Sequence, residues 1–364
     1  MNHGWKYITS DECFSSITPK SKIEKKYYSE GHLIPIISQE EEFISGYWDN
    51  YSDITPHERP IVIFGDHSRV LKYIDFDFVV GADGVKILLP NESIDAKFLY
   101  YYLKWKDVPS LGYSRHFKLL KDYNYLCPPI IRQAEIVSEL DKINELIGVK
   151  RSQLKDLDAL AQSLFNETFS SIGETVPLSF YVNALVGGKS LASKEVSPNK
   201  VLKSGAVTYD YFDKNSTKYL PVDYTPDAEH SVSTGDLIIS RMNTAELVGA
   251  CAYVFDVDDN VYLPDRLWRI EYKSNANPIY LWKSLISESA KGQIRSKASG
   301  TSGSMKNISK PLLLSINIKK VPISIQQQFA ERIEAIEAQK NRVEASIADL
   351  KTLLASRMDY WFND

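Results

Sequence analysis

Cysteine, histidine and long apolar runs are scarce in this chain of 364 residues. The three cysteines, Cys13, Cys127 and Cys251, are far apart, so they offer neither a disulfide framework nor a paired-cysteine metal motif. The six histidines are equally scattered and form no HxxxH or HExxH pair. No apolar run reaches the roughly 18 residues of a membrane span, and the N-terminal residues contain no apolar signal segment. We therefore expect a soluble, cytoplasmic protein.

A complete nucleotide-binding loop is also missing. Gly187-Gly188-Lys189-Ser190 resembles the end of a phosphate-binding loop, but Asn183 stands where that loop needs its first glycine. We therefore do not expect nucleotide binding. The segment fits either a flexible loop whose amide groups and lysine contact a phosphate, or a surface loop without a ligand.

The most informative feature that is present is a long helical pattern that occurs twice. Its two copies open at Pro129 and Pro322 with a proline, apolar residues and a glutamine, Gln133 or Gln326. Apolar residues then recur in alternating steps of four and three, which is the period of about 3.5 residues of a coiled-coil seam. The first seam contains Ile136, Leu140, Ile143, Ile147, Leu154, Leu157, Ala161 and Leu164, and the second contains Phe329, Ile333, Ile336, Val343, Ile347, Leu350 and Leu354.

Each of these segments is longer than an ordinary core helix. About 37 residues in a helix span about 55 Å, well beyond the usual length in globular proteins. One such helix would be interpreted as part of a core, but two matched copies indicate helices that pair through their stripes. We predict an α+β chain with a pseudo-twofold internal repeat, in which two long antiparallel coiled-coil helices separate two globular domains. The predicted boundaries are residues 1–129, 130–170, 171–321 and 322–364, in the order domain, spacer helix, domain, spacer helix.

The two globular stretches repeat a weaker pattern. In each, a strand-like run, Ile61–Phe64 or Leu237–Ile239, ends in polar residues. An aromatic helical stretch and then a polar, glycine-containing loop follow in both. The two stretches share an order of elements but differ in their loops, which suggests that they bind two related ligands with different specificity.

This order of domains and helices resembles the specificity subunits of type I restriction-modification systems, and the related subunits of two-component systems that cut DNA beside their site. The resemblance is carried by the two helix openings, the heptad helices, and the segments Pro60–Arg69, Val79–Val85 and Gly235–Arg241. It covers nearly the whole chain. It implies a non-catalytic subunit with two target-recognition domains, each reading one half of a bipartite, asymmetric DNA site. The helices would set the gap and dock two DNA adenine methyltransferase subunits.

The same resemblance implies that the chemistry belongs to the partners. S-adenosylmethionine is expected in the methyltransferase subunits, which would modify adenine on a flipped base; whether restriction or translocase subunits join is left open. This chain has no Phe-x-Gly-x-Gly loop and neither an Asn-Pro-Pro-Tyr nor an Asp-Pro-Pro-Tyr motif. Its Cys127-Pro128-Pro129-Ile130 lacks both the acid or amide and the aromatic residue of such a motif. We expect no cofactor in this chain.

The candidate DNA-binding residues are donors that follow strands or flank glycines. Arg241 and Asn243 follow an apolar strand, where a guanidinium could bond guanine and an amide could bond adenine. A salt bridge is an equally good interpretation of Arg241. Glycines in the loops permit close approach to a duplex. The full predicted set is His67, Arg69, Arg115, His116, Lys118, Lys189, Ser190, Arg241, Asn243, Lys291, Arg295, Lys297, Thr301, Ser304 and Lys306.

The net charge of −4 is compatible with a DNA partner because of how the charges are distributed. The excess of acidic residues lies in the helical segments 131–170 and 325–364. Between Lys283 and Lys310, Glu288 is the only acidic residue among six cations. Such a patch can attract phosphates, although the same pattern is typical of a solvated helix face.

Two other functions remain as alternatives to DNA recognition, and each belongs to a different class of protein. A coiled-coil adaptor whose globular domains bind proteins would fit the low overall basicity, and it predicts no salt-dependent duplex binding. A self-sufficient enzyme is disfavoured because the cofactor motifs are missing.

Overall fold

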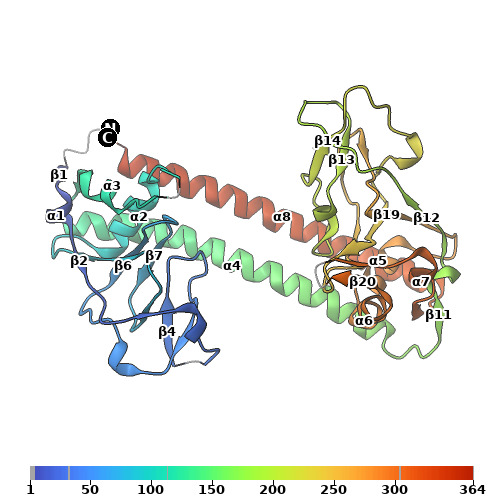
Figure 1. Ribbon diagram of the computed structural model, residues 1–364, viewed down its shortest axis with the longest axis horizontal. Coiled ribbons are helices and arrows are strands. Elements are labelled where there is room, and N and C mark those ends of the chain that lie inside the picture. Colours follow the sequence, from blue (N-terminus) through green and yellow to red (C-terminus); the bar gives the residue numbers. More distant parts are fainter. Residues whose placement is uncertain (1–4, 32, 113, 303–304, 364) are drawn as a thin grey trace. The chain divides into compact units, whose positions relative to one another are not determined.

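The computed structural model describes residues 5–31, 33–112, 114–302 and 305–363. The chain divides into two compact units, which we call unit 1 (Met1–Gln153 and Val343–Asp364) and unit 2 (Leu154–Arg342). Two helices of 40 residues each, α4 (Ile130–Phe169) and α8 (Ile323–Phe362), contribute one segment to each unit (Figure 1). The predicted α+β class and the two long helices are confirmed. No helix within the described residues is long and apolar enough to cross a membrane.

Unit 1 contains two four-stranded sheets in its described part. The first is antiparallel with the order β2-β9-β6-β7, and the second mixes parallel and antiparallel pairs in the order β3-β8-β4-β5. Ile37 and Val80 of the second sheet pack with Ile61, Ile63 and Ile87 of the first, so the core lies between the sheets. The strands are β2 (Phe14–Ile17), β3 (Lys22–Ile23), β4 (Ile34–Ile37), β5 (Gly46–Trp48), β6 (Ile61–Gly65), β7 (Leu71–Ile74), β8 (Val79–Gly81) and β9 (Val85–Pro90).

Short helices and one further strand pair complete unit 1. Helix α2 (Ala96–Lys106) packs on β6, β7 and β9, and its N-cap Asp95 accepts a hydrogen bond from Phe98 N. Strand β1 (Lys6–Ile8) pairs with β10 (Tyr125–Cys127), which leads directly into α4. The remaining helical elements are α1 (Ser10–Cys13), α3 (Phe117–Asp122), η1 (Lys25–Tyr27) and η2 (Tyr51–Asp53).

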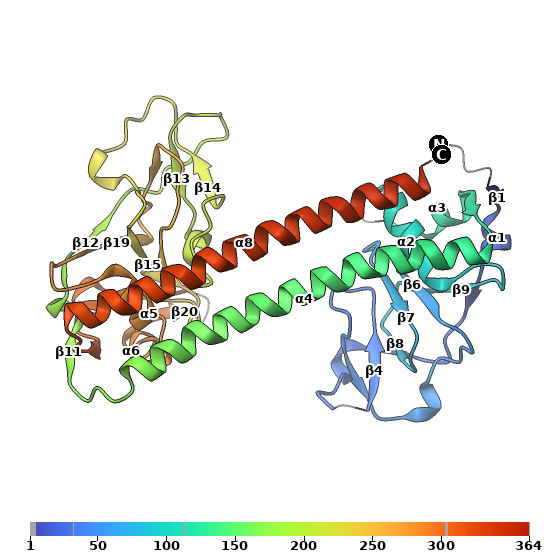
Figure 2. The ribbon, with the colours of Figure 1, turned by 180° about the vertical axis from the view of Figure 1, so that it is seen from behind.

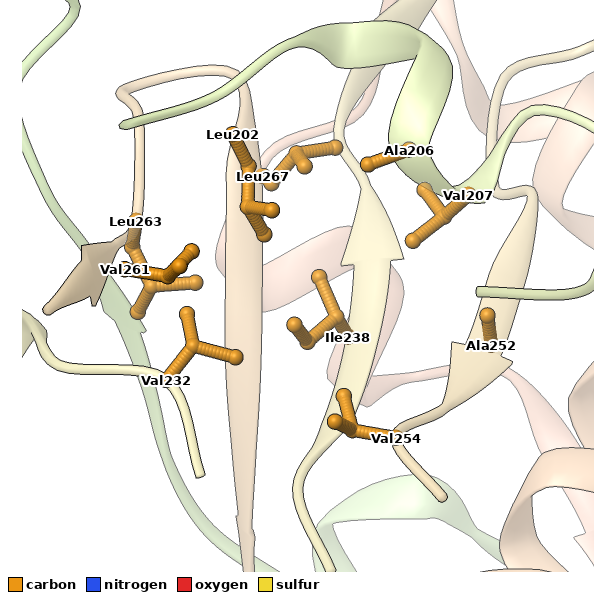
Figure 3. Packing of buried hydrophobic residues seen from close by; sticks show 10 residues of the cluster. All are labelled: Leu202, Ala206, Val207, Val232, Ile238, Ala252, Val254, Val261, Leu263 and Leu267. Atoms are coloured by element: carbon orange, nitrogen blue, oxygen red, sulfur yellow. The ribbon is translucent and has the colours of Figure 1, made fainter. Parts of the chain in front are cut away.

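Unit 2 repeats the first sheet of unit 1. Its antiparallel sheet has the order β12-β19-β15-β17, and the central β15 (Leu237–Ser240) is buried along its whole length, as β6 is in unit 1. Figure 3 shows Ile238 of this sheet and Val254, which follows β17, packed with Val261 and Leu202 of the second sheet and Val207 of η4. The strands are β12 (Val182–Gly187), β17 (Cys251–Tyr253) and β19 (Leu267–Tyr272) in the first sheet, and β13 (Lys200–Leu202), β14 (Thr217–Tyr219) and β18 (Val261–Tyr262) in the second.

A third small sheet and three short helices distinguish the remainder of unit 2. The sheet has the order β16-β21-β20, and β11 pairs with β22 as β1 pairs with β10 in unit 1. Helix α5 packs on β15, β17 and β22, and α6 packs on α5, α7 and β22. The strands are β11 (Thr175–Pro177), β16 (Met242–Asn243), β20 (Ser299–Ser302), β21 (Met305–Asn307) and β22 (Asn317–Lys319). The helical elements are α5 (Pro278–Leu285), α6 (Glu288–Lys297), α7 (Lys310–Leu314), η3 (Leu178–Phe180), η4 (Ser204–Val207) and η5 (Ala228–His230).

Within each unit the segments of α4 and α8 run antiparallel, side by side in both views (Figure 1, Figure 2). In unit 1, Arg132 stacks on Trp361 with 4.9 Å from guanidinium carbon to ring centroid, while Glu139 pairs with Arg357. In unit 2, Asp158 pairs with Lys340 at 2.7 Å, and Phe165 contacts Phe329 further along α4. The residues of both predicted seams are buried or half-buried. The coiled-coil prediction is therefore confirmed.

Candidate nucleic-acid interface

Several predicted residues of unit 2 meet at one edge of the sheet β12-β19-β15-β17. The register pairs Gly187 of β12 with Trp268 of β19, and Ser240 of β15 with Leu267. The chain leaves or enters all three strands at this edge, which we call the unit 2 edge. The segments that emerge there are 188–190, 265–266 and 241–243.

The guanidinium of Arg241 is held in place at the unit 2 edge. Its Nε donates to Asp265 O at 2.7 Å, and Nη1 donates to Asn307 Oδ1 at 3.5 Å. The guanidinium carbon lies 5.7 Å from the ring centroid of Trp268. Within the described residues Arg241 has no carboxylate partner, so the interpretation of Arg241 as part of a salt bridge is wrong. Among the same residues, no acceptor is bonded to its Nη2. A fixed, half-buried guanidinium with a free end suits bidentate recognition of an acceptor pair.

The glycine loop at the same edge is held by side chains and by close packing. Ser190 Oγ bonds the carboxylate of Asp265, while Lys189 is exposed. The amide of Gly188 donates to Pro264 O at 3.0 Å, so it does not face a ligand. A Cβ at Gly188 would lie 2.0 Å from a backbone oxygen of the neighbouring segment. Packing therefore requires a glycine at this position. The sequence suggested that amide groups of this loop contact a phosphate, and for the amide of Gly188 that suggestion is wrong.

The β16-β21-β20 sheet carries two further predicted residues. Asn243 is opposite Lys306 in the register, and Asn243 Oδ1 accepts from Thr244 N at 2.9 Å. Lys306 Nζ donates to Gly300 O at 3.3 Å. Thr301 belongs to β20, but its side chain is outside the described part, and Ser304 lies outside the described residues.

Helix α6 presents its three predicted cations differently. Lys291 is turned inward and forms an ion pair with Asp210. Arg295 donates to Glu246 O at 3.3 Å, in the loop that follows Asn243. Lys297 has no ion pair or hydrogen bond with a described residue. Of the three, Lys291 stabilises the fold, Arg295 is exposed and Lys297 is half-buried.

Backbone hydrogen bonds identify the residue of unit 1 that corresponds to Arg241. In unit 2, Ile308 N donates to Arg241 O at 3.0 Å, and Arg241 N donates to a carbonyl at the start of β19. In unit 1, His116 N donates to Asp66 O at 2.8 Å, and Asp66 N donates to Gly84 O at the start of β9. The counterpart of Arg241 is therefore Asp66. The predicted residues His67 and Arg69 lie one and three residues further along the chain.

The two equivalent positions have opposite charges. Asp66 is buried, accepts from Phe117 N at 2.8 Å, and lies 3.7 Å from Lys86 Nζ. Lys86 in turn lies 5.2 Å above the ring of Phe117. Unit 1 thus has a buried carboxylate and an ammonium where unit 2 has an arginine on a tryptophan. The same backbone arrangement therefore carries a carboxylate in unit 1 and a guanidinium in unit 2.

The predicted residues His67, Arg69 and His116 are bonded to the backbone of unit 1. His116 is fully buried, with Nδ1 2.9 Å from Asp66 O and Nε2 accepting from Leu111 N at 3.0 Å, which leaves neither ring nitrogen for a ligand. His67 Nδ1 lies 3.2 Å from a loop carbonyl. Arg69 has a φ of 63° and donates to Val108 O at 2.7 Å. These three side chains shape the loops of unit 1.

Arg115 and Lys118 are the predicted residues of unit 1 that remain exposed. Neither forms an ion pair or hydrogen bond with a residue that the structure describes. The sequence interpretation missed Lys86 and the exposed Arg266, whose carbonyl accepts from Arg241 N at 3.0 Å. Both lie at the start of a strand with no local motif, so only strand pairing reveals their place.

Clustered metal-ligand side chains and activated thiols are not seen among the residues that the structure describes. They contain no group of three or more histidines, cysteines or acids that could hold a metal. Burial raises the pKa of the Cys13 and Cys251 thiols, which disfavours the reactive thiolate.

The chain is similar to several known proteins. Residues 188–351 match the family model described as type I restriction modification DNA specificity domain. The chain is 24% identical over 317 residues to the type I restriction enzyme MjaVIII specificity subunit of Methanocaldococcus jannaschii, which covers 78% of this chain and 74% of the relative. It is 26% identical over 149 residues to the type I restriction enzyme EcoKI specificity subunit of Escherichia coli, which covers 40% of this chain and 32% of the relative.

Two solved structures share the fold. The crystal structure of the S subunit of a type I restriction-modification system from M. genitalium matches with a TM-score of 0.58 and 16% identity, over 99% of this chain and 96% of that one. A chain from a structural study of complex assembly and conformational transition of the type I system matches with a TM-score of 0.55 and 15% identity. That match covers 98% of this chain and 97% of the other.

Proposed function

We propose that this chain, which belongs to the family of type I restriction-modification specificity subunits, recognises DNA for such a complex, each unit reading one half of a bipartite, asymmetric site. The observation that carries this proposal is the pair of equivalent sheet edges with different chemistry. Asp66 and Arg241 occupy the same point of a duplicated frame. Two edges of this kind are suited to two different half-sites.

In unit 2, Arg241 is the residue best placed to read a base. Its guanidinium is oriented by three protein contacts before any ligand binds, so little side-chain entropy is lost on binding. A guanidinium donates two hydrogen bonds to guanine O6 and N7 in the major groove. The exposed Lys189 and Arg266 beside it are suited to phosphates, which fix the register on the duplex. In unit 1, Arg115 and Lys118 would take that second role.

The methyltransferase partners would dock on the long helices. Ile131, Leu146, Val149 and Leu160 of α4 are exposed although they are aliphatic. Exposed apolar side chains on a helix are typical of a protein-binding surface. We propose two DNA adenine methyltransferase subunits there, with S-adenosylmethionine bound to them, no catalysis by this chain, and a cytoplasmic complex that restriction subunits can join.

A domain exchange tests the proposal. Segment 171–321 is replaced by the matching segment of a related subunit, and adenine methylation is mapped by sequencing DNA from cells that also express the methyltransferase. One half of the methylated sequence should change, while the other half and the gap stay constant. A change in both halves would contradict independent reading. If methylation did not depend on this chain at all, the proposal would fail.

A further inference from the structure

Two exposed tyrosines form a stacked pair in the loop after η4. Tyr209 is 72% exposed and Tyr211 is 55% exposed. Their ring centroids are 6.3 Å apart, and the ring planes differ by 16°. The pair therefore presents two phenol groups to solvent from neighbouring positions, and the base-reading role proposed for Arg241 does not account for it.

Asp210, between the two tyrosines, fixes this loop to the core. Its φ of 64° is in the left-handed region, which aspartate tolerates better than most residues. Its Oδ1 accepts from Cys251 N at 3.1 Å, and its carbonyl accepts from Trp282 Nε1 at 3.0 Å. The carboxylate also pairs with Lys291. These contacts hold the tyrosine pair in one orientation.

The pair lies beside the unit 2 edge. Cys251, which donates to Asp210, begins β17 and is opposite Ile239 of β15. The turn before β17 is joined to the end of β15, because Gly249 N donates to Ser240 O at 2.9 Å. Arg241 is the next residue of the chain. The tyrosine loop is therefore continuous with the surface that carries Arg241.

The charges next to the pair favour an anionic partner. Helix α6 carries Arg295 and Lys297 as well as Lys291, which is paired with Asp210. Its one acidic residue, Glu288, lies 3.9 Å from Arg295, so the helix keeps an excess of positive charge. A surface of this composition attracts a polyanion. Tyrosine hydroxyls are common donors to phosphate oxygens in protein–DNA complexes.

We propose that Tyr209 and Tyr211 form a second DNA contact of unit 2, in which their hydroxyl groups donate to backbone phosphates. This inference rests on the proposed function and extends it from base reading to a clamp on the DNA backbone. Because the loop is already ordered by Asp210, binding requires little further ordering. The clamp is neutral, so it positions the duplex without releasing counterions.

The test uses the chain assembled with its methyltransferase. The double variant Tyr209→Phe/Tyr211→Phe keeps both rings and removes both hydroxyls. Its affinity should fall about tenfold on cognate and unrelated duplexes alike, because two hydrogen bonds are lost. The dependence of affinity on salt should keep its slope, since no cation is removed. Tyr272→Phe is the matched control, because Tyr272 is 38% exposed at the opposite end of β19 and should bind DNA normally.

The outcomes separate this inference from the proposed function. If the double variant binds every duplex as the wild type does, while Arg241→Ala changes sequence preference, the clamp is overturned and DNA recognition by this chain stands. If the double variant loses methyltransferase in size-exclusion chromatography but binds duplex normally, the pair is a protein contact and the clamp is again overturned. If the wild-type complex shows no salt-dependent duplex binding, both proposals fail.

Discussion

Gln133 and Gln326 are buried at equivalent points of the two units, where each joins the first turn of a long helix to the segment before a shorter helix. Gln133 Oε1 accepts from Asp95 N at 2.8 Å, and its Nε2 donates to the carbonyl groups of Ser93 and Pro128, both at 2.8 Å. One amide side chain thus satisfies three backbone groups, two just before α2 and one just before α4.

Gln326 repeats this arrangement in unit 2. Its Oε1 accepts from Asn277 N at 2.7 Å, and its Nε2 donates to the carbonyl groups of Asn275 and Val321 at 3.1 and 2.8 Å. Asn277 is the N-cap of α5, as Asp95 is the N-cap of α2. The internal repeat therefore extends to individual hydrogen bonds.

Replacing either glutamine should destabilise its own unit. Gln133→Leu or Gln326→Leu removes the hydrogen bonds to three largely buried backbone groups, which should lower the free energy of unfolding by about 1–3 kcal/mol. Thermal unfolding followed by circular dichroism measures the effect. Gln327→Leu changes an exposed neighbour and should melt like the wild type. Equal melting of all three variants would mean that these hydrogen bonds do not stabilise the units.

The long helices could be predicted from the sequence because burial follows the period of the seam. Ile136 and Leu140 are fully buried and Leu157 is 9% exposed, as the steps of four and three require. The shared glutamine was visible as a motif, but its role was not. Its partners Ser93 and Asn275 lie about 40 and 50 residues earlier in the chain.

The sheet edges could not be predicted to the residue. The correspondence of Asp66 with Arg241 depends on hydrogen bonds to segments that are distant in sequence. His116 was predicted from its place beside a glycine loop, but it is buried, and its ring nitrogens are bonded to Asp66 O and Leu111 N. Residue type and local spacing contain no information about such contacts.

Charged substitutions in the seam should be costly. Leu157→Asp in unit 2 and Ile347→Asp in unit 1 each place a carboxylate at a buried position without a partner, which should cost several kcal/mol. Leu160→Asp is the control, since Leu160 is 52% exposed on the same helix. Thermal melting should separate the two seam variants from the control. Wild-type melting of both seam variants would disprove the paired-helix arrangement.

The ion pair of Glu139 with Arg357 makes stability depend on pH. The hydrogen bond from Arg357, supported by Trp361, lowers the pKa of Glu139 below its usual value. A lowered pKa in the folded state means that the stabilisation is complete above the unfolded pKa of about 4.3 and is lost as the pH falls through the folded pKa. Glu139→Gln should therefore melt below the wild type at pH 7.

The difference between Glu139→Gln and the wild type should shrink at a pH below about 4, because the wild-type carboxylate then takes up a proton. Melting curves at both pH values measure this change. Glu145→Gln alters an exposed glutamate of α4 and should show no such pH dependence. An equal difference at both pH values would show that packing, and not charge, accounts for the effect.

Arg241 and Lys297 should differ in the kind of binding that they provide. Arg241→Ala should relax the preference at one base position by about 1–3 kcal/mol, because a bidentate contact with a base edge favours one sequence over others. Lys297→Ala should weaken binding to every duplex alike and reduce the salt slope by about one, because it removes a single phosphate contact. Competition binding at several salt concentrations, with the methyltransferase present, distinguishes the two effects.

Lys273→Ala is the control for these two variants, because Lys273 follows β19 at the end of the sheet remote from Arg241. A uniform loss for Arg241→Ala would make Arg241 a phosphate contact, since a base reader cannot weaken all sequences equally. The position of Arg241 on Trp268 would then serve to orient a phosphate donor. Normal binding by both variants would mean that DNA binds elsewhere than at the unit 2 edge. Among the described residues of that edge, Arg241 is the one whose guanidinium is fixed by three protein contacts.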